Sequence, residues 1–368
     1  MPRTFRVAII GSTGKGNYGH GIDTVWKAIP EAEIVALADD DAQGRAAGVA
    51  RTGAKTGYAD YREMLDRERP EVVAIGPRWV NRHFEMVMAC AERGCHIFME
   101  KPFCRTLAEA DRLVRQCEMS HVKLAIAHQT RYSPTTAAVQ KLIAAGTLGT
   151  LLELRARGKE DQRGGAEDLW VLGSHLMNLM QCFAGDAATC CATLASQGRP
   201  VVKADVVEGK EGLGPLAGDQ VDARFDFAGG VVGYFASHRQ QAGTPSRFAL
   251  QLFGSKGVVE VLPGYLEPAW FLPDASWSPG RSGAKWVAVS SAGLGVAEPL
   301  KPGGLHAGNV AAVQDLLAAI GAQRQPLCDV YAARATIEMI MAVFESHRTG
   351  GPVSLPLENR QHPLAMLK

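Results

Sequence analysis

The sequence predicts a two-domain α/β and α+β protein, in which a parallel sheet flanked by helices is followed by a large, mostly antiparallel sheet. Three observations support this fold class. The chain has 368 residues, whereas single hydrophobic cores stop growing at about 250 to 300 residues. Short apolar runs alternate with helix-like segments up to residue 128, and longer alternating runs follow. We therefore expect domains at 1–128 and 129–368, with the closing helix free to pack back on the first.

The first domain is predicted from short apolar runs that alternate with amphipathic segments. This alternation is typical of a parallel sheet covered by helices on both faces. The strand-like runs are RVAII, EIVALAD, EVVAIG, CHIFME and VKLAIA, while YREMLDRE and HFEMVMACAERG are helix-like.

The second domain begins with the helix-like stretch PTTAAVQKLIAAG and then changes in pattern. Alternating apolar and polar residues favour antiparallel strands with one face left to solvent or to a partner. The strand-like runs are LLELRARG, QVDARFDFAGGVVGYFASH, FALQLFGSKGVVEVLP and KWVAVS, and the helices are DLWVLGSHLMNLMQCFAG, HAGNVAAVQDLLAAI and AARATIEMIMAVFESHRTG.

Composition excludes several classes of partner. The formal net charge is +1, and no block of like charges suggests a nucleic-acid or membrane-surface site. The eight cysteines form no C-x-x-C pair, so we expect reduced thiols, no disulfide and no metal site. No apolar stretch reaches about 18 residues. We expect a soluble, cytoplasmic protein that binds a small molecule.

The first strand runs into a glycine-rich loop, RVAIIGSTGKGNYGHG. Such a loop lets backbone N–H groups approach a pyrophosphate, and a following helix adds its positive end. We predict that helix in GIDTVWKAI. The pattern departs from G-x-G-x-x-G because Thr13 replaces the second glycine. The predicted contacts to the cofactor come from Gly11, Ser12, Thr13, Gly14 and Gly16.

The second strand ends in two aspartates that strengthen this interpretation. Asp39 lies 28 residues after Gly11, where a carboxylate accepts hydrogen bonds from the adenosine ribose. Asp39 and Asp40 would repel a 2′-phosphate, so NAD is favoured over NADP. The alternative is a solvated acidic loop at the start of the next helix.

The fourth strand is followed by Glu100 and Lys101. In open α/β sheets the ligand lies beyond the carboxyl ends of the strands. A partly desolvated lysine beside a positive nicotinamide ring would have a lowered pKa, which suits a residue that moves a hydroxyl proton. A solvated loop lysine is the alternative.

These motifs, together with HFEMVMACAERGCHIFMEKPF, QTRYSP, GSHLMN and the final SLPL, resemble the Gfo/Idh/MocA family of nicotinamide-dependent oxidoreductases. The resemblance implies a Rossmann domain, a C-terminal domain with an open antiparallel sheet, and a Lys101–Pro102 bond that is often cis. It also implies that Lys101 bridges cofactor and substrate.

The resemblance implies a second catalytic residue, His175, on a helix that faces the nicotinamide. The family motif has an aspartate four residues earlier, where this chain has Val171, and Asn178 replaces a later aspartate. The base that replaces the missing aspartate is left open. A histidine satisfied within the core is the alternative for His175.

Further pocket residues follow from the same resemblance. For Tyr132 and Arg78 the alternative is a structural role as hinge residues between the domains. The remaining cofactor candidates are Pro77, Arg78, Trp79, His83 and Gln129, and the substrate candidates are Arg131, Tyr132, Asp168 and Asn178.

A basic segment, LELRARGKEDQRGG, precedes the His175 helix. Arg155 and Arg157 alternate with apolar residues, so they point to one strand face. We hypothesise that they, with Lys159 and Arg163, clamp an anionic group on a sugar. A solvated sheet face is the alternative.

The sequence therefore predicts an NAD-dependent oxidoreductase that acts on a secondary hydroxyl of a sugar, glycoside or cyclitol. One alternative is a glycoside hydrolase that uses NAD in a cycle of oxidation, elimination, hydration and reduction. Another is a non-catalytic sensor of the NAD/NADH ratio. Large sheet faces commonly associate, so we also expect a homo-oligomer, a dimer or a tetramer.

Overall fold

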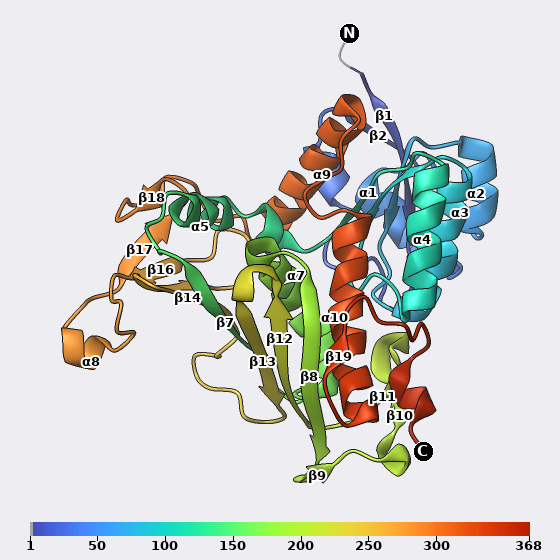
Figure 1. Cartoon of the computed structure of the whole chain (residues 1–368). Helices are drawn as coiled ribbons and strands as arrows, with labels where there is room; N and C mark the ends of the chain where they lie inside the picture. Colours follow the sequence, from blue (N-terminus) through green and yellow to red (C-terminus); the bar gives the residue numbers. More distant parts are fainter. Residues whose placement is uncertain (1–2) are drawn as a thin grey trace. The chain divides into compact units, whose positions relative to one another are not determined.

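The computed structural model describes residues 3–368. The chain forms two units (Figure 1). The first contains residues 3–128, 210–214 and 305–334, and the second contains 129–209, 215–304 and 335–368. The predicted fold class is confirmed, because one unit holds a parallel sheet and the other a large, mostly antiparallel sheet.

The first unit is built on a six-stranded parallel sheet in the order β3-β2-β1-β4-β5-β6. The order reverses between β1 and β4, which places the carboxyl ends of these strands at the site where such sheets bind ligands. The strands are β1 Phe5–Ile10, β2 Ala32–Ala38, β3 Thr56–Tyr58, β4 Val72–Ile75, β5 His96–Met99 and β6 Leu124–Ile126.

Helices α1, α2 and α4 of this unit begin at side-chain caps that the sequence supplies. Asp41 accepts a hydrogen bond from the backbone N of Gly44, and Thr106 accepts one from Glu109. The helices are α1 Ala42–Thr52, α2 Tyr61–Glu68, α3 His83–Glu92, α4 Leu107–Met119 and, after the second sheet, α9 Gly304–Ala322.

The prediction of a helix in GIDTVWKAI is wrong. Only a short 3₁₀ turn, Val25–Ala28, forms there. Gly16, Gly19 and Gly21 have positive φ angles of 87°, 65° and 82°, which a right-handed helix does not contain. The glycine loop therefore ends without the helix that would add a positive dipole.

The second unit contains an 11-stranded sheet in the order β18-β17-β16-β15-β14-β7-β13-β12-β8-β19, with β9 on β8. Its pairs are antiparallel except β7 with β13. The strands are β7 Leu151–Arg157, β8 Ala187–Ser196, β9 Arg199–Pro200, β12 Gln220–Phe227, β13 Val232–His238, β14 Ala249–Gly254, β15 Gly257–Val261, β16 Ala269–Leu272, β17 Val287–Ser290, β18 Gly293–Leu294 and β19 Val353–Ser354. The short strands β10 Val207–Gly209 and β11 Gly214–Leu216 pair with each other.

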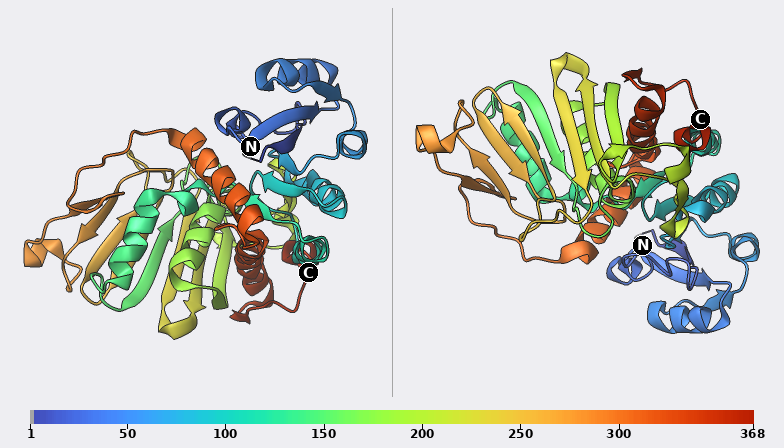
Figure 2. Two further views of the ribbon diagram at one scale, coloured as in Figure 1. Left: turned by 90° about the horizontal axis from the view of Figure 1, so that it is seen from above. Right: turned by 90° about the horizontal axis from the view of Figure 1, so that it is seen from below.

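One face of this sheet is covered by helices and the other is open. Helices α5 and α7 lie on the same face (Figure 2). Phe235 points toward α7, since a Cβ added at Gly173 would lie 3.0 Å from its ring. The next residue along β13, Tyr234, is 41% exposed on the open face. The helices are α5 Pro134–Ala144, α6 Ala166–Val171, α7 Gly173–Ala184, α8 Pro279–Ser282 and α10 Val330–Thr349. Residues of α10 up to Arg334 belong to the first unit, and those from Ala335 onward belong to the second.

Candidate functional site

The carboxylate of Asp39 holds the start of the glycine loop. It accepts hydrogen bonds from the backbone N of Thr13 at 3.1 Å and from Thr13 Oγ1 at 2.8 Å. The backbone N of Asp41 donates to the same carboxylate at 3.0 Å. Asp39 is buried at the end of β2, so the residue predicted for ribose binding also fixes the loop.

The glycines of this loop allow close packing against neighbouring backbone. A Cβ added at Gly16 would lie 2.3 Å from the backbone N of Arg78. One added at Gly11 would lie 2.2 Å from the ring of Tyr18, which is itself buried. Glycine is therefore required at Gly11 and Gly16 because neighbouring protein atoms leave no room for a Cβ, independently of any ligand.

A cavity of about 220 Å³ opens beside Asp39. Asp39 and Asp40 line it together with Arg62 and Arg82, and Arg82 Nη1 lies 3.6 Å from Asp40 Oδ2. Apolar walls beside strand-end carboxylates suit an adenosine moiety.

The loop also offers an unused donor. Within residues 3–368, Ser12 Oγ is buried and has no hydrogen-bond partner. A buried hydroxyl without a partner is costly unless a ligand or water satisfies it. The cavity and this hydroxyl both fit a dinucleotide with its phosphates against the loop.

The residues predicted to cover the cofactor after β4 have other partners. His83 is fully buried, and its ring nitrogens lie 2.7 Å from the carbonyl oxygens of Pro77 and Pro102. Burial lowers the pKa of His83. His83 therefore braces the two strand-end loops. Arg78 Nη2 lies 3.5 Å from Glu211, and Trp79 is half-buried before a 3₁₀ turn.

Glu100 and Lys101 follow β5, and the Lys101–Pro102 bond is cis. Glu100 is 1% exposed. Its Oε2 accepts a hydrogen bond from the backbone N of Lys101 at 3.0 Å, while Oε1 accepts from His20. Burial raises the pKa of Glu100, but the hydrogen bonds and charges of His20 and Lys101 outweigh this effect and leave the pKa below its ordinary value. Lys101 is thus tied to a carboxylate that stays ionised.

Sequence reasoning missed His20. It lies 80 residues from Glu100 in the chain, and its Nδ1 is 2.6 Å from Glu100 Oε1. The available signal was a histidine inside a glycine-rich loop.

In the second unit, His175 lies in the first turn of α7 and is half-buried. Val171, at the position of the family aspartate, is a buried apolar residue. Asn178 is buried, and its Nδ2 donates to Thr336 Oγ1 at 3.3 Å. Arg131 Nη1 donates to the carbonyl oxygen of Asn178 at 3.0 Å. Arg131 and Asn178 are therefore brought together, beside the buried Gln129 and Tyr132.

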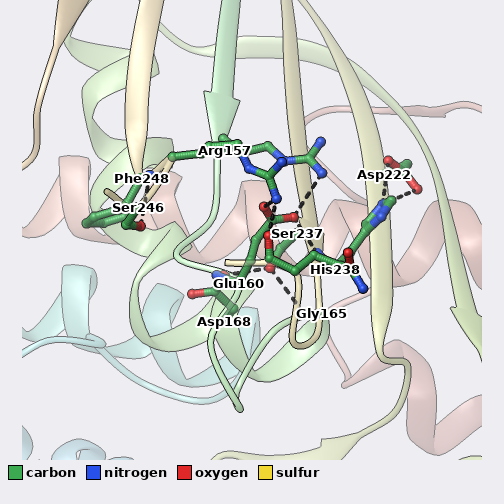
Figure 3. A network of polar contacts seen from close by, with 11 residues as sticks. Arg157, Glu160, Gly165, Asp168, Asp222, Ser237, His238, Ser246 and Phe248 are labelled. Atoms are coloured by element: carbon green, nitrogen blue, oxygen red, sulfur yellow. Dashed lines mark hydrogen bonds and ion pairs between the residues drawn. The ribbon is translucent and has the colours of Figure 1, made fainter. Parts of the chain in front are cut away.

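Asp168 belongs to a different network from the one predicted. It is fully buried, and its Oδ2 accepts hydrogen bonds from Ser237 Oγ at 2.6 Å and from the backbone N of Glu160 at 3.1 Å (Figure 3). Burial raises the pKa of Asp168. Because its Oδ2 is held by Ser237 and by the backbone of Glu160, Asp168 shapes the loop before α6.

The basic segment does not form the predicted anion clamp. Arg155 is paired with Glu153, Arg163 with Asp161 at 2.7 Å, and Arg157 with the buried Glu160 at 2.9 Å. The fourth basic residue of the segment, Lys159, is exposed. Partner acids thus offset three of the four charges.

The face of the strand on which these arginines lie is a second reason why they do not form the predicted clamp. Arg155 and Arg157 do share a face, since they pair with Tyr234 and Ala236 of β13. That face is the open one, opposite the helix that carries His175. An anion on a substrate held by His175 would not meet these guanidinium groups.

Two further expectations concern metals and membranes. Within residues 3–368, no group of three or more His, Cys, Asp or Glu side chains could hold a metal ion. In the same range, no helix combines the length and apolar character that crossing a bilayer requires.

Comparison with known proteins gives matches in both units. Residues 5–128 match the model of the oxidoreductase family with an NAD-binding Rossmann fold, and residues 136–260 match the GFO/IDH/MocA C-terminal domain. D-apiose dehydrogenase of Paraburkholderia graminis is 34% identical over 40% of this chain and 38% of its own length. Levoglucosan dehydrogenase of Pseudarthrobacter phenanthrenivorans is 26% identical over 63% of this chain and 65% of its own length. The aligned segments thus span less than two thirds of these relatives.

A solved structure of levoglucosan dehydrogenase, in complex with NADH and levoglucosan, has the same fold. It covers 96% of this chain and all of its own, with a TM-score of 0.78 and 20% sequence identity.

Proposed function

Since the chain belongs to the Gfo/Idh/MocA family, we propose that it is an NAD-dependent oxidoreductase acting on a secondary hydroxyl of a sugar, glycoside or cyclitol. The observation that carries this proposal is the strand-end pair Glu100–Lys101, held beyond β5 in the NAD-binding domain. The named relatives are sugar dehydrogenases, which supports the substrate class.

Within this proposal, the loop from Gly11 to Gly16 holds the pyrophosphate, with Ser12 Oγ as a donor. Asp39 and Asp40 hold the adenosine ribose at the cavity beside β2. NAD, when bound, accepts the hydride at C4 of its nicotinamide.

Lys101 is assigned the proton of the substrate hydroxyl. An amine fixed beside the carbon that loses a hydride can hydrogen-bond the hydroxyl and accept its proton as the carbonyl forms. His175 is assigned a hydrogen bond to the substrate. Since Val171 offers no carboxylate in the turn before it, His175 works without the aspartate of the family motif.

The names of the relatives do not favour the NAD-dependent hydrolase or the redox sensor. Both alternatives would retain the NAD site, so the reaction distinguishes them. We also propose that the protein works in the cytoplasm, where its eight cysteines would stay reduced.

The test is NADH formation, followed by absorbance, with a panel of neutral sugars, 1,6-anhydro sugars and cyclitols. At least one is expected to give NADH in proportion to the sugar consumed. Each assay is repeated with NADP and with no sugar. Cleavage of an aryl glycoside without net NADH would contradict the proposal in favour of the hydrolase, and absence of turnover with NAD binding retained would favour the sensor.

The open sheet face is proposed to join two copies of the chain. Tyr234 and Trp270 are 41% and 37% exposed, and strand pairing through Arg155, Gln251 and Glu260 places them in one row. A cavity of about 570 Å³ lies along this row. Exposed aromatic residues on a broad sheet face are typical of protein interfaces.

Tyr234→Arg is expected to shift the mass of the protein in solution toward the monomer, because a second positive charge beside Arg155 would have to be buried at the interface. Light scattering at micromolar concentration measures the mass. Met119→Arg adds the same charge at an exposed site of the first unit and should leave the mass unchanged. A monomeric parent protein would contradict the proposal.

A further inference from the structure

The glycine loop carries a histidine that the proposed chemistry leaves unused. The backbone N of His20 donates to Glu100 Oε1 at 2.8 Å, and its ring Nδ1 lies 2.6 Å from the same oxygen. The His20 side chain is 37% exposed, whereas Glu100 is almost completely buried. One residue of the loop therefore provides two contacts to a carboxylate that has little access to water.

The same carboxylate connects His20 to Lys101. While Oε1 of Glu100 faces His20, Oε2 accepts the backbone N–H of Lys101 at 3.0 Å. The orientation that satisfies His20 thus also places an acceptor on the backbone of Lys101. A rotation of the Glu100 side chain would break both contacts together.

His20 is held in place from two sides. Gly19, with φ of 65°, allows the close approach, since a Cβ there would lie 2.4 Å from Glu100 Cγ and 2.5 Å from the carbonyl oxygen of Gly76. On the other side, Nδ2 of the buried Asn309 in α9 donates to the carbonyl oxygen of His20 at 2.9 Å. The loop therefore presents His20 in a fixed geometry.

The charges around Glu100 explain why this contact matters. Three ionisable groups act on the carboxylate: His20, Lys101 and the buried His83. Burial raises the pKa of Glu100 and lowers that of His83, so His83 tends to be neutral. His20 and Lys101 both lower the pKa of Glu100, and the ring of His20 contacts Oε1 directly.

We propose that His20 is a positioning residue, which keeps Glu100 ionised and directed at the backbone of Lys101 and thereby holds Lys101 ready to accept the hydroxyl proton. This proposal rests on the oxidoreductase function proposed above. It extends the active site to a loop that would otherwise serve only the pyrophosphate.

The kinetic test uses His20→Ala and His20→Asn, because the amide of asparagine can replace Nδ1 as a neutral donor. His20→Ala is expected to lower kcat by about 10- to 100-fold, the range for losing one hydrogen bond to a charged group. KM and the calorimetric Kd for NAD should change much less. His20→Asn should recover most of kcat, because the amide restores a hydrogen bond to the Glu100 carboxylate. His121→Asn, an exposed histidine with a positive φ that asparagine accommodates, is the matched control.

A second readout needs no substrate. In His20→Ala at pH 6, infrared spectroscopy should detect the carbonyl band of a protonated carboxyl that is absent from the parent and from the His20→Ala/Glu100→Gln double variant. No such band, or a kcat of His20→Ala equal to that of His121→Asn, would overturn the proposal. If the parent oxidises none of the sugars, the oxidoreductase function fails, and the infrared band alone decides whether His20 keeps Glu100 ionised.

Discussion

Lys101→Met is expected to lower kcat by on the order of 10²-fold or more while NAD binding is retained. Methionine keeps much of the length of lysine but cannot accept a proton. The backbone N of Lys101, which donates to Glu100, is unaffected by the substitution. The loss should therefore fall on proton transfer and leave the fold of the strand end intact.

The comparison is made with the best sugar of the panel, and NAD affinity is measured by calorimetry. Lys141→Met, on the exposed surface of α5, is the control and should retain full turnover. A Lys101→Met enzyme with the kcat of the parent would rule out Lys101 as the proton acceptor. Loss of NAD binding would instead assign Lys101 to the cofactor site.

Asp39→Ala is expected to reduce the free energy of unfolding by about 2 to 4 kcal/mol and to weaken NAD binding. The carboxylate accepts hydrogen bonds from Thr13 N, Thr13 Oγ1 and Asp41 N. A fully buried donor left without an acceptor costs about 1 to 3 kcal/mol, and these three contacts are partly buried. Water entering the vacated space would satisfy part of this set, so the full sum is not expected.

Urea unfolding measures the stability, and Asp40→Ala is the matched control. Asp40 is exposed, and its contact with Arg82 at 3.6 Å is a surface pair worth about 0 to 1 kcal/mol. If both variants lose the same stability, Asp39 does not anchor the loop. If Asp39→Ala binds NAD like the parent, its role is structural alone.

Several strands of both sheets were predicted from the sequence because their pattern is local, whereas β3, β8 and β16 were not predicted. Runs such as VAII and VVAI are apolar throughout, as expected of strands buried on both faces. Along β7, Leu154 and Ala156 are buried and Arg155 is exposed, which is the alternation of a sheet with one open face. Neighbouring residues are sufficient to establish these features.

The errors arose where distant residues decide the outcome. The clamp assigned to Arg155 and Arg157 depended on which face of the sheet the helices cover, and that is set by packing. Glu160 is held by Arg157 and also by Arg247, 87 positions later in the chain. Similarly, the pairing of His20 with Glu100 joins a loop to a strand end that lie far apart in sequence. A pattern of neighbouring residues does not predict contacts between side chains that lie far apart in the sequence.

The parallel pairing of β7 with β13 has a consequence for how the molecule folds. The centre of the large sheet closes only when residues 151–157 meet 232–238 and 249–254, so its contacts span long stretches of chain. Contacts of high sequence separation slow folding, because loop-closure entropy is lost before they form. Helix α7 with His175 lies inside the segment that must be closed. The part of the sheet that supports the helix carrying His175 is therefore complete only after residues 232–254 have paired with β7.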